Sequence, residues 1–197
     1  MTTYQVFTDG SSSRNRKTIG TSYIIFKNRE SEPIRTFCKG FKDEQARNGI
    51  AELLGVYYFL RDLCVTEDLY IEEKSEIVIY SDSQYVVNEF TEWFRNQMMK
   101  NFFDTKNKEI IIYILWMLYI LRQEGFKIKF EWIRGHQKKE NFEAFGNNWA
   151  DSFACQSHDE TVCSDNMRDI EEVVKDLRED IKEEGTLQTI RKIYLGI

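Results

Sequence analysis

Hydrophobic and polar residues alternate at several places along the chain in the manner of β-strands. This pattern predicts five strands, at residues 3–8, 21–27, 33–39, 76–82 and 127–133. The first and fourth run into a carboxylate, so Asp9 and Asp82 are each expected at the tip of a strand. A strand that ends in Asp-Gly is most often only a turn, because both residues suit turn geometry. Taken alone, the stretch around Asp9 therefore indicates no chemistry.

Apolar residues recur at helical spacing between residues 46 and 63, which predicts a helix there. Residues 83–94 suggest one or two short helices, and residues 95–108 a mixed loop. The apolar run at residues 110–121 fits either a strand or a helix, and it is too short to span a bilayer. Residues 141–156 look like a loop that leads into a helix. We interpret the 110–121 run as a buried core element.

This order of elements predicts an α/β fold, a mixed sheet with helices packed on its faces. We expect a domain at residues 1–156 and an acidic helical C-terminal extension at residues 157–197. The extension carries two amphipathic stripes, Ile170, Val173, Val174, Leu177 and Ile181, then Leu187, Ile190, Tyr194 and Ile197. The stripes favour helices that pack on the domain, and a protein partner for the extension is the alternative.

The charge of the chain is unevenly distributed. The net charge is −6, whereas a nucleic-acid-binding protein is usually basic. Residues 155–197 hold 11 acidic and six basic residues, so most of the negative charge lies in the extension. The four cysteines, Cys38, Cys64, Cys155 and Cys163, show no CxxC spacing. No signal peptide is recognisable, so we expect reduced thiols in an intracellular protein.

Four acidic residues lie where a site could form. Asp9 and Asp82 end strands, while Glu52 and Asp151 lie in predicted helices, and Asn147 is one helical turn before Asp151. Each acidic residue alone is more often a solvated surface residue. Together they would repel one another unless cations lay among them, and Mg²⁺ prefers such oxygen ligands. Two ions roughly 4 Å apart can activate water and stabilise a leaving oxygen in phosphodiester cleavage.

Five motifs then follow one another along the chain: TDGS, NGIAEL, YSDSQYV, EWIRGH and NNWAD. In this order they resemble the type 1 ribonuclease H family, over roughly residues 3–154. The resemblance implies a ribonuclease H-like fold with a five-stranded mixed sheet. It also implies two-metal hydrolysis of the RNA strand of RNA/DNA hybrids, with two Mg²⁺ ions or Mn²⁺ in their place. The products would carry 5′-phosphate and 3′-hydroxyl ends.

The resemblance assigns roles to individual residues. The metal-binding carboxylates are Asp9, Glu52, Asp82 and Asp151. His136 matches a loop histidine that aids proton transfer or product release, and Asn147 takes a supporting role. The residues expected to contact the hybrid are Gly10, Ser11, Asn48 and Gln84. Residues 93–108 resemble a basic protrusion that grips the DNA strand, with Trp93 stacking on a sugar and phosphate contacts from Arg95, Lys100, Lys106 and Lys108.

The chain also departs from the family pattern. The turn after DGS reads SSRNRKTIG, where the family often has a glycine-rich turn, and Gly49-Ile50 replaces a frequent Asn-Arg pair. The loop from His136 to Asp151 is longer than in compact bacterial members of the family and carries Lys138 and Lys139. His158 belongs to no motif, so we expect it on the surface. The alternatives are another two-metal nuclease, such as a resolvase or exonuclease, and a non-catalytic hybrid-binding module. The DGS, DSQ and GH motifs favour ribonuclease H. We also expect a monomer that does not associate with membranes.

Overall fold

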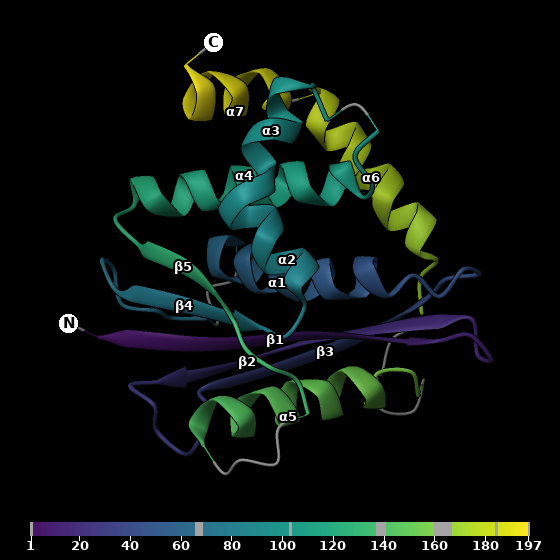
Figure 1. The fold of residues 1–197 in the computed structure, drawn as a ribbon, viewed down its shortest axis with the longest axis vertical. Coiled ribbons are helices and arrows are strands. Elements are labelled where there is room, and N and C mark those ends of the chain that lie inside the picture. Colours follow the sequence, from purple (N-terminus) through teal and green to yellow (C-terminus); the bar gives the residue numbers. More distant parts are fainter. Residues whose placement is uncertain are drawn as a thin grey trace.

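A five-stranded sheet in the order β3-β2-β1-β4-β5 forms the middle layer of the computed structural model (Figure 1). The structure describes residues 2–65, 69–102, 104–136, 141–159, 167–183 and 185–196. Lys138, Lys139, Cys163 and Ile197, named above, lie outside the described residues. The strands are β1 (Thr3–Ser13), β2 (Thr18–Lys27), β3 (Arg35–Lys42), β4 (Glu76–Ser81) and β5 (Lys127–Trp132). The predicted five-stranded mixed sheet is therefore confirmed.

Strand β1 is longer than its sequence pattern predicts, and this changes the place of Asp9. It pairs antiparallel with β2 as far as Ser13 and Thr18. Its parallel pairing with β4 ends earlier, at Phe7 and Tyr80. Asp9 is thus not at the tip of β1, as predicted, but in the part of β1 that projects beyond β4. The prediction was wrong because small polar residues, which resemble a turn, here continue the hydrogen bonding with β2.

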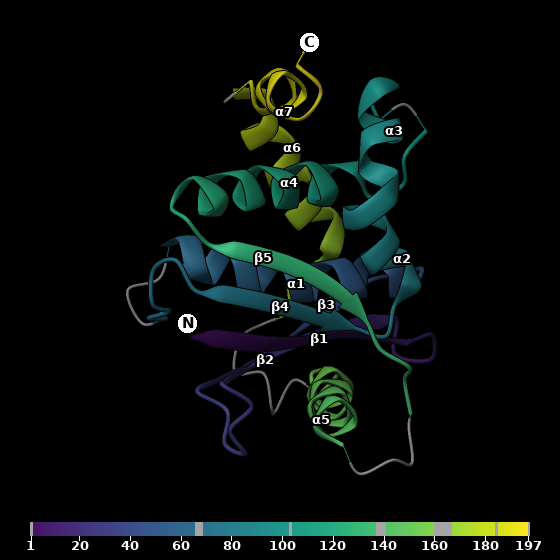
Figure 2. The same cartoon turned by 60° about the vertical axis from the view of Figure 1, so that its left-hand side comes forward.

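Helices cover both faces of the sheet. The helices are α1 (Asn48–Val65), α2 (Gln84–Asn88), the π-helix η1 (Glu89–Trp93), α3 (Phe94–Met99), α4 (Lys108–Gln123), α5 (Phe142–Gln156), α6 (Ile170–Glu183) and α7 (Thr186–Leu195). In Figures 1 and 2, α5 lies alone on one face, while α1, α4 and then α6 and α7 are layered on the other. Because both faces are covered, β2 is buried almost throughout. Within the described ranges, no helix combines the length and apolar character that crossing a membrane requires.

Two predictions between the strands are settled by this arrangement. The ambiguous run at residues 110–121 is helical and lies within α4, because it packs against α1 instead of joining the sheet. The segment expected as a mixed loop from residue 95 begins as a helix, since α3 continues η1 to Met99. Turns follow only from Lys100 onward.

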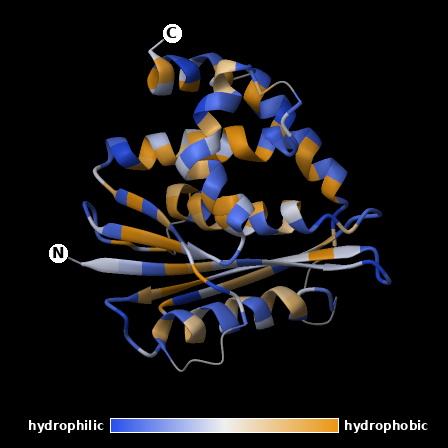
Figure 3. Ribbon diagram, viewed as in Figure 1, coloured by the Kyte–Doolittle hydropathy of each residue, from blue (hydrophilic) through white to orange (hydrophobic). Residues whose placement is uncertain are grey.

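The sheet is fixed by hydrophobic packing on each face. The ring of Phe7 stacks on Tyr80 with centroids 5.0 Å apart, and it meets Phe142 of α5 edge to face. Full burial of one such side chain contributes roughly 1.5–3 kcal/mol to stability. On the other face α1 is buried along nearly its whole length between the sheet and α4. Figure 3 shows α1 and α4 as largely hydrophobic, whereas α6 alternates. The backbone on either side of Asp9 is therefore held rigidly.

The C-terminal helices pack on α4 and α3. Ile170, Val173, Leu177 and Ile190 are buried in the same core as α1 and α4. The Tyr194 hydroxyl donates a hydrogen bond to the Leu115 carbonyl (3.2 Å). The backbone N–H of Lys42 donates to the Arg168 carbonyl (3.0 Å), which ties the start of the extension to β3. The extension therefore adds a further layer to the core.

Candidate active site

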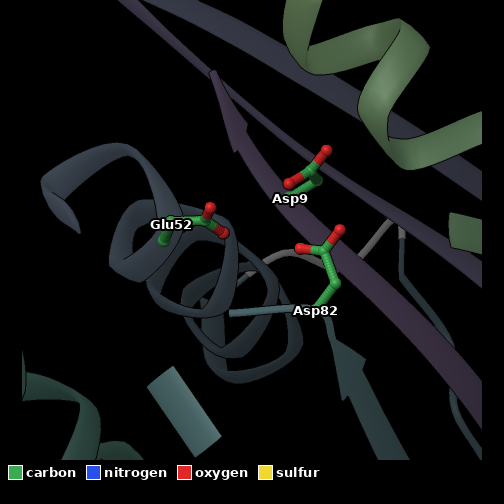
Figure 4. A group of neighbouring side chains, drawn as sticks. All are labelled: Asp9, Glu52 and Asp82. Carbon is green, nitrogen blue, oxygen red and sulfur yellow. The ribbon is translucent and has the colours of Figure 1, made fainter. Parts of the chain in front are cut away.

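Three carboxylates from three different elements converge beside the middle strand. Asp9 comes from β1, Glu52 from α1 and Asp82 from the residue after β4. Each offers an oxygen atom, and these atoms all lie within 4.8 Å of one another. Figure 4 shows the three side chains pointing toward one another. The structure thus brings together three of the four carboxylates that the sequence singled out.

The position of Asp9 and Glu52 follows from a close approach of two backbones. Gly10 lies directly against the first half of α1, and a Cβ atom there would overlap the backbone at Glu52. Only glycine allows this approach. The N–H of Gly10 also donates to the Asp9 carboxylate (2.8 Å), and the Asn48 amide donates to Glu52 one helical turn away (3.2 Å). The two carboxylates are therefore oriented by the local chain.

Asp82 is held from three sides. Strand β4 stops before it, and Ser83 caps α2 by accepting a hydrogen bond from the Val86 N–H (3.4 Å). The amide of Asn147 donates to the Asp82 carboxylate (3.2 Å), while its supporting role stays a prediction. Gly135 lies so close to this carboxylate that a Cβ atom there would overlap it. The loop after β5 therefore closes against the cluster.

Burial makes the cluster electrostatically unfavourable for bare carboxylates. Asp9 is 4% exposed and Glu52 is 7% exposed. Burial, followed by the charge of Asp82, raises the pKa of Asp9 to about 8. Burial and the charges of Asp9 and Asp82 likewise raise the pKa of Glu52 well above its usual range. A divalent cation would offset these charges.

Unsatisfied oxygens indicate where such a cation fits. Glu52 Oε2 is buried and has no hydrogen-bond partner among the described residues, and the same is true of Asn147 Oδ1. A buried polar atom without a partner is costly, so it is uncommon in folded proteins. Carboxylate oxygens are the donors that Mg²⁺ prefers. The donor set of Asp9, Glu52 and Asp82 therefore fits a divalent metal ion.

Asp151 lies on α5, beside the three-residue cluster. After burial and the charge of Asp82, the charge of Asp151 also contributes to the raised pKa of Asp9. The Cys155 thiol, one helical turn further on, donates to Asp151 Oδ1 (3.6 Å). Asp151 is half-buried, so it has access to both the cluster and solvent. Its role as the fourth metal-binding residue stays a prediction.

The loop histidine lies close to the cluster but faces solvent. His136 follows Gly135, which contacts Asp82, and its side chain is exposed. Its backbone is in the left-handed region (φ 48°), an uncommon conformation for a non-glycine residue. An exposed imidazole beside buried carboxylates is suitably placed to exchange protons with solvent. Its catalytic role remains a prediction.

His158, which we expected on the surface, is another residue whose predicted place was wrong. It is half-buried, and both ring nitrogens lie within hydrogen-bond distance of hydroxyl groups: Nδ1 with Thr18 (2.8 Å) and Nε2 with Ser11 (3.1 Å). Burial, with a smaller effect of Arg16, lowers its pKa. His158 therefore fastens the end of α5 to the projecting part of β1. No local motif could reveal this, because its partners lie about 140 residues away.

The residues expected to contact a hybrid lie on several different elements. Ser11 lies on the projecting part of β1, and the exposed side chains of Asn48 and Gln84 begin α1 and α2. Trp93 ends η1 with 39% of its surface exposed. Lys100 and Lys106 are exposed in the segment between α3 and α4, and Lys108 is exposed as the first residue of α4. Their contacts with nucleic acid remain predictions.

The segment that carries these lysines is fixed next to the start of α1. The Asn107 amide donates to the Tyr85 hydroxyl (3.2 Å), and both side chains lie near Gly49. The lysines on either side of Asn107 therefore flank the end of α1 that bears Asn48. This places the basic segment and the carboxylate cluster along one helix terminus.

Comparison with known proteins agrees with this fold. The RNase H family model matches residues 1–159. Ribonuclease HI of Haemophilus influenzae is 30% identical over 132 residues, which are 67% of this chain and 77% of that protein. Ribonuclease H of Bordetella avium is 28% identical over 152 residues, 77% of this chain and 88% of that protein.

Solved structures show the same fold at low sequence identity. LC9-RNase H1, a type 1 RNase H with the type 2 active-site motif, superposes with a TM-score of 0.62 at 16% identity. That match covers 79% of this chain and 72% of LC9-RNase H1. LC11-RNase H1 in complex with RNA/DNA hybrid superposes with a TM-score of 0.53 at 16% identity, over 81% of this chain and 99% of that one. Together with the family match, these findings confirm the resemblance carried by the five motifs: the chain belongs to the ribonuclease H family.

Proposed function

We propose that this protein is an endoribonuclease that hydrolyses the RNA strand of RNA/DNA hybrids and leaves 5′-phosphate and 3′-hydroxyl ends. The family is metal-dependent, and we assign two Mg²⁺ ions to Asp9, Glu52, Asp82 and Asp151. The observation that carries the proposal is the convergence of three carboxylates, two of them buried, around the unpartnered Glu52 Oε2. LC11-RNase H1, whose fold this chain shares, was solved with a hybrid bound.

The residues of the chain prepare the site for this chemistry. When bound, the metal ions supply a reactive water and stabilise the leaving oxygen. The Gly10 N–H and the Asn48 and Asn147 amides hold the carboxylates of Asp9, Glu52 and Asp82 in one orientation. Fixed orientation reduces the reorganisation needed in the transition state. His136, exposed at the edge of the cluster, serves proton transfer or product release.

Recognition of the RNA strand depends on polar groups beside the cluster. The Asn48 amide nitrogen is engaged by Glu52, so its carbonyl oxygen is the atom that can accept a hydrogen bond from a 2′-hydroxyl. Gln84 offers both a donor and an acceptor, while Gly10 and Ser11 line the rim. Trp93 and the lysines at 100, 106 and 108 would contact the DNA strand, where phosphate contacts give affinity without sequence preference.

The test is a cleavage assay on one set of labelled substrates: RNA/DNA, RNA/RNA, DNA/DNA and single-stranded RNA. Each is incubated with Mg²⁺, with chelator, and with the Asp9→Asn protein. We expect metal-dependent cutting of RNA in the hybrid alone, lost in the variant. Cutting of branched or duplex DNA instead would overturn the proposal in favour of a resolvase or exonuclease. Tight hybrid binding without cutting would overturn it in favour of a binding module.

A further inference from the structure

A pocket of about 270 Å³ lies where the start of α4 meets the C-terminal helices. Asn101 and Lys108 line it from the basic segment, and Arg178 and Lys182 line it from α6. In Figure 1 this is the end of α4 that adjoins α6. The pocket is separate from the carboxylate cluster, and no assigned role includes its α6 residues.

The pocket is positively charged although the extension is acidic. Helix α6 contains six acidic and three basic residues, yet two of those three basic residues line the pocket. Lys108 adds a third cation, and among the described residues the lining holds one carboxylate, Glu109, which is buried and paired with Arg178 Nε (2.9 Å). The Arg178 side chain stays 54% exposed in that pair. The lining therefore favours an anion.

Two further features strengthen this preference. The pocket contains the N-terminus of α4, a 16-residue helix, where the helix dipole adds partial positive charge. Asn107, which precedes the helix, makes no side-chain capping hydrogen bond. The rest of the lining is apolar, from Ile112, Ile181 and Leu187. An apolar wall lowers the local dielectric constant and strengthens attraction between the cations and a phosphate.

A continuous row of contacts joins the pocket to the carboxylate cluster. Glu52 contacts Asn48, and the neighbouring Gly49 lies near Tyr85 and Asn107. Asn107 directly precedes Lys108, which lines the pocket. These contacts connect the pocket lining to residues that we propose to contact the hybrid. A strand bound to both Asn48 and Lys108 would therefore come near Arg178 and Lys182.

We propose that Arg178 and Lys182 of the C-terminal extension bind a backbone phosphate of the DNA strand of the hybrid, beyond the basic segment. This inference rests on the proposed function and deepens it by giving the extension a part in substrate binding. Arginine suits such a site because its planar guanidinium can present two N–H donors to one phosphate. Lys182 adds a mobile point charge.

The experiment compares Lys182→Gln with Lys175→Gln in the full-length protein. Both substitutions remove one positive charge from an exposed position of α6, but Lys175 lies outside the pocket lining and pairs with Glu179 (3.9 Å). Arg178 is left intact because its removal would strand the buried Glu109. We measure kcat, KM and the salt dependence of hybrid binding, on a long hybrid and on a short one centred on the same cleavage site.

We expect Lys182→Gln to raise KM about threefold or more on the long hybrid and to leave kcat unchanged. The slope of log affinity against log salt should fall by about 0.7–0.9, the contribution of one phosphate contact. Lys175→Gln should match the wild type. Equal KM and equal slopes for the two variants, with a wild type that cleaves hybrids, would overturn this inference alone. A wild type that neither binds nor cleaves hybrids would overturn the proposed function and this inference with it.

Discussion

The carboxylate cluster and helix α6 are both rich in acidic residues, yet their surroundings are opposite. In the cluster, Asp9 and Glu52 are buried, and burial and neighbouring carboxylates raise their pKa values. On α6, the acidic side chains of Glu171, Asp176 and Glu179 are each more than half exposed and lie within 4 Å of arginine or lysine nitrogens. The same two residue types therefore form a candidate metal site in one region and a solvated, ion-paired surface in the other.

This difference shows which property identifies a metal site. Residues 155–197 hold a net charge of −5, while the remaining 22 acidic and 21 basic residues nearly balance. A search by charge density would therefore select the extension. The carboxylates that we propose as metal ligands lie in the nearly neutral part, where Asp9 and Glu52 are buried and Glu52 Oε2 has no hydrogen-bond partner among the described residues. Desolvation without a counter-charge, and not the number of acidic residues, makes a cation favourable.

The largest effect should come from making the same substitution in both regions. Glu52→Gln removes a buried carboxylate that we propose as a metal ligand, so we expect hybrid cleavage to fall on the order of 10³-fold or more, since metal chemistry contributes several kcal/mol of transition-state stabilisation. Glu171→Gln removes an exposed, ion-paired carboxylate and should leave kcat within about twofold. Single-turnover cleavage of one labelled hybrid measures both. Equal rates for the two variants would mean that burial does not distinguish the regions.

An effect of intermediate size is expected on the free energy of unfolding, which should depend on pH when metal ions are removed with a chelator. The folded protein keeps a proton on Asp9 up to a pKa of about 8, whereas the unfolded chain releases it near 3.8. Stability should therefore decline as pH rises from about 4 to about 8, by on the order of 1 kcal/mol or more. Urea unfolding in chelator, from pH 4 to pH 9, measures this decline. Mg²⁺ should flatten it, and the Asp9→Asn substitution should reduce it, because Glu52 also contributes.

Asp43 provides a control, because its pKa is lowered in the folded protein whereas that of Asp9 is raised. Burial alone would raise its pKa, but hydrogen bonds from the Arg47 side chain and from the backbone of Arg47 and Gln45 lower it overall. Its stabilising contribution is therefore present above pH 3.8 and is lost as pH falls below that value. Asp43→Asn should weaken the protein at neutral pH and leave the decline toward pH 8 unchanged. A flattened decline in this variant would refute the assignment to Asp9.

The smallest effect concerns the ion pairs of Arg47, one of which joins the extension to the domain. Arg47 contacts both Asp43 (3.1 Å) and Glu171 (2.6 Å). Arg47→Gln should lower the free energy of unfolding by about 1 kcal/mol, mostly through the buried Asp43. A double-mutant cycle with Glu171→Gln should assign only about 0.2–1 kcal/mol to the exposed pair. A larger coupling energy would mean that the acidic residues of α6 are structural, like buried ion pairs.

Much of the fold and the cluster could be predicted from the sequence, because local patterns encode them. Five strands, the buried helix around Glu52 and the order of the motifs follow from alternation and helical spacing. The 110–121 run stayed ambiguous, since a continuously apolar segment has no alternation of polar and apolar residues that separates strand from helix. Asp9 was wrongly predicted at a strand tip because the end of a strand depends on how far its neighbouring strands continue, and β2 continues to pair with β1 beyond Asp9. His158 was missed because its hydrogen bonds depend entirely on tertiary structure.

The contact of Gly10 with α1 has a consequence for transplanting this site. With no side chain between the β1 and α1 backbones, the spacing of Asp9 and Glu52 is set by the two main chains in contact and not by the reach of flexible side chains. A designer who grafts only the acidic residues onto another scaffold would therefore lose the spacing. The unit to transfer is a strand and a helix whose backbones meet at a glycine, because this contact sets the distance between the two carboxylates.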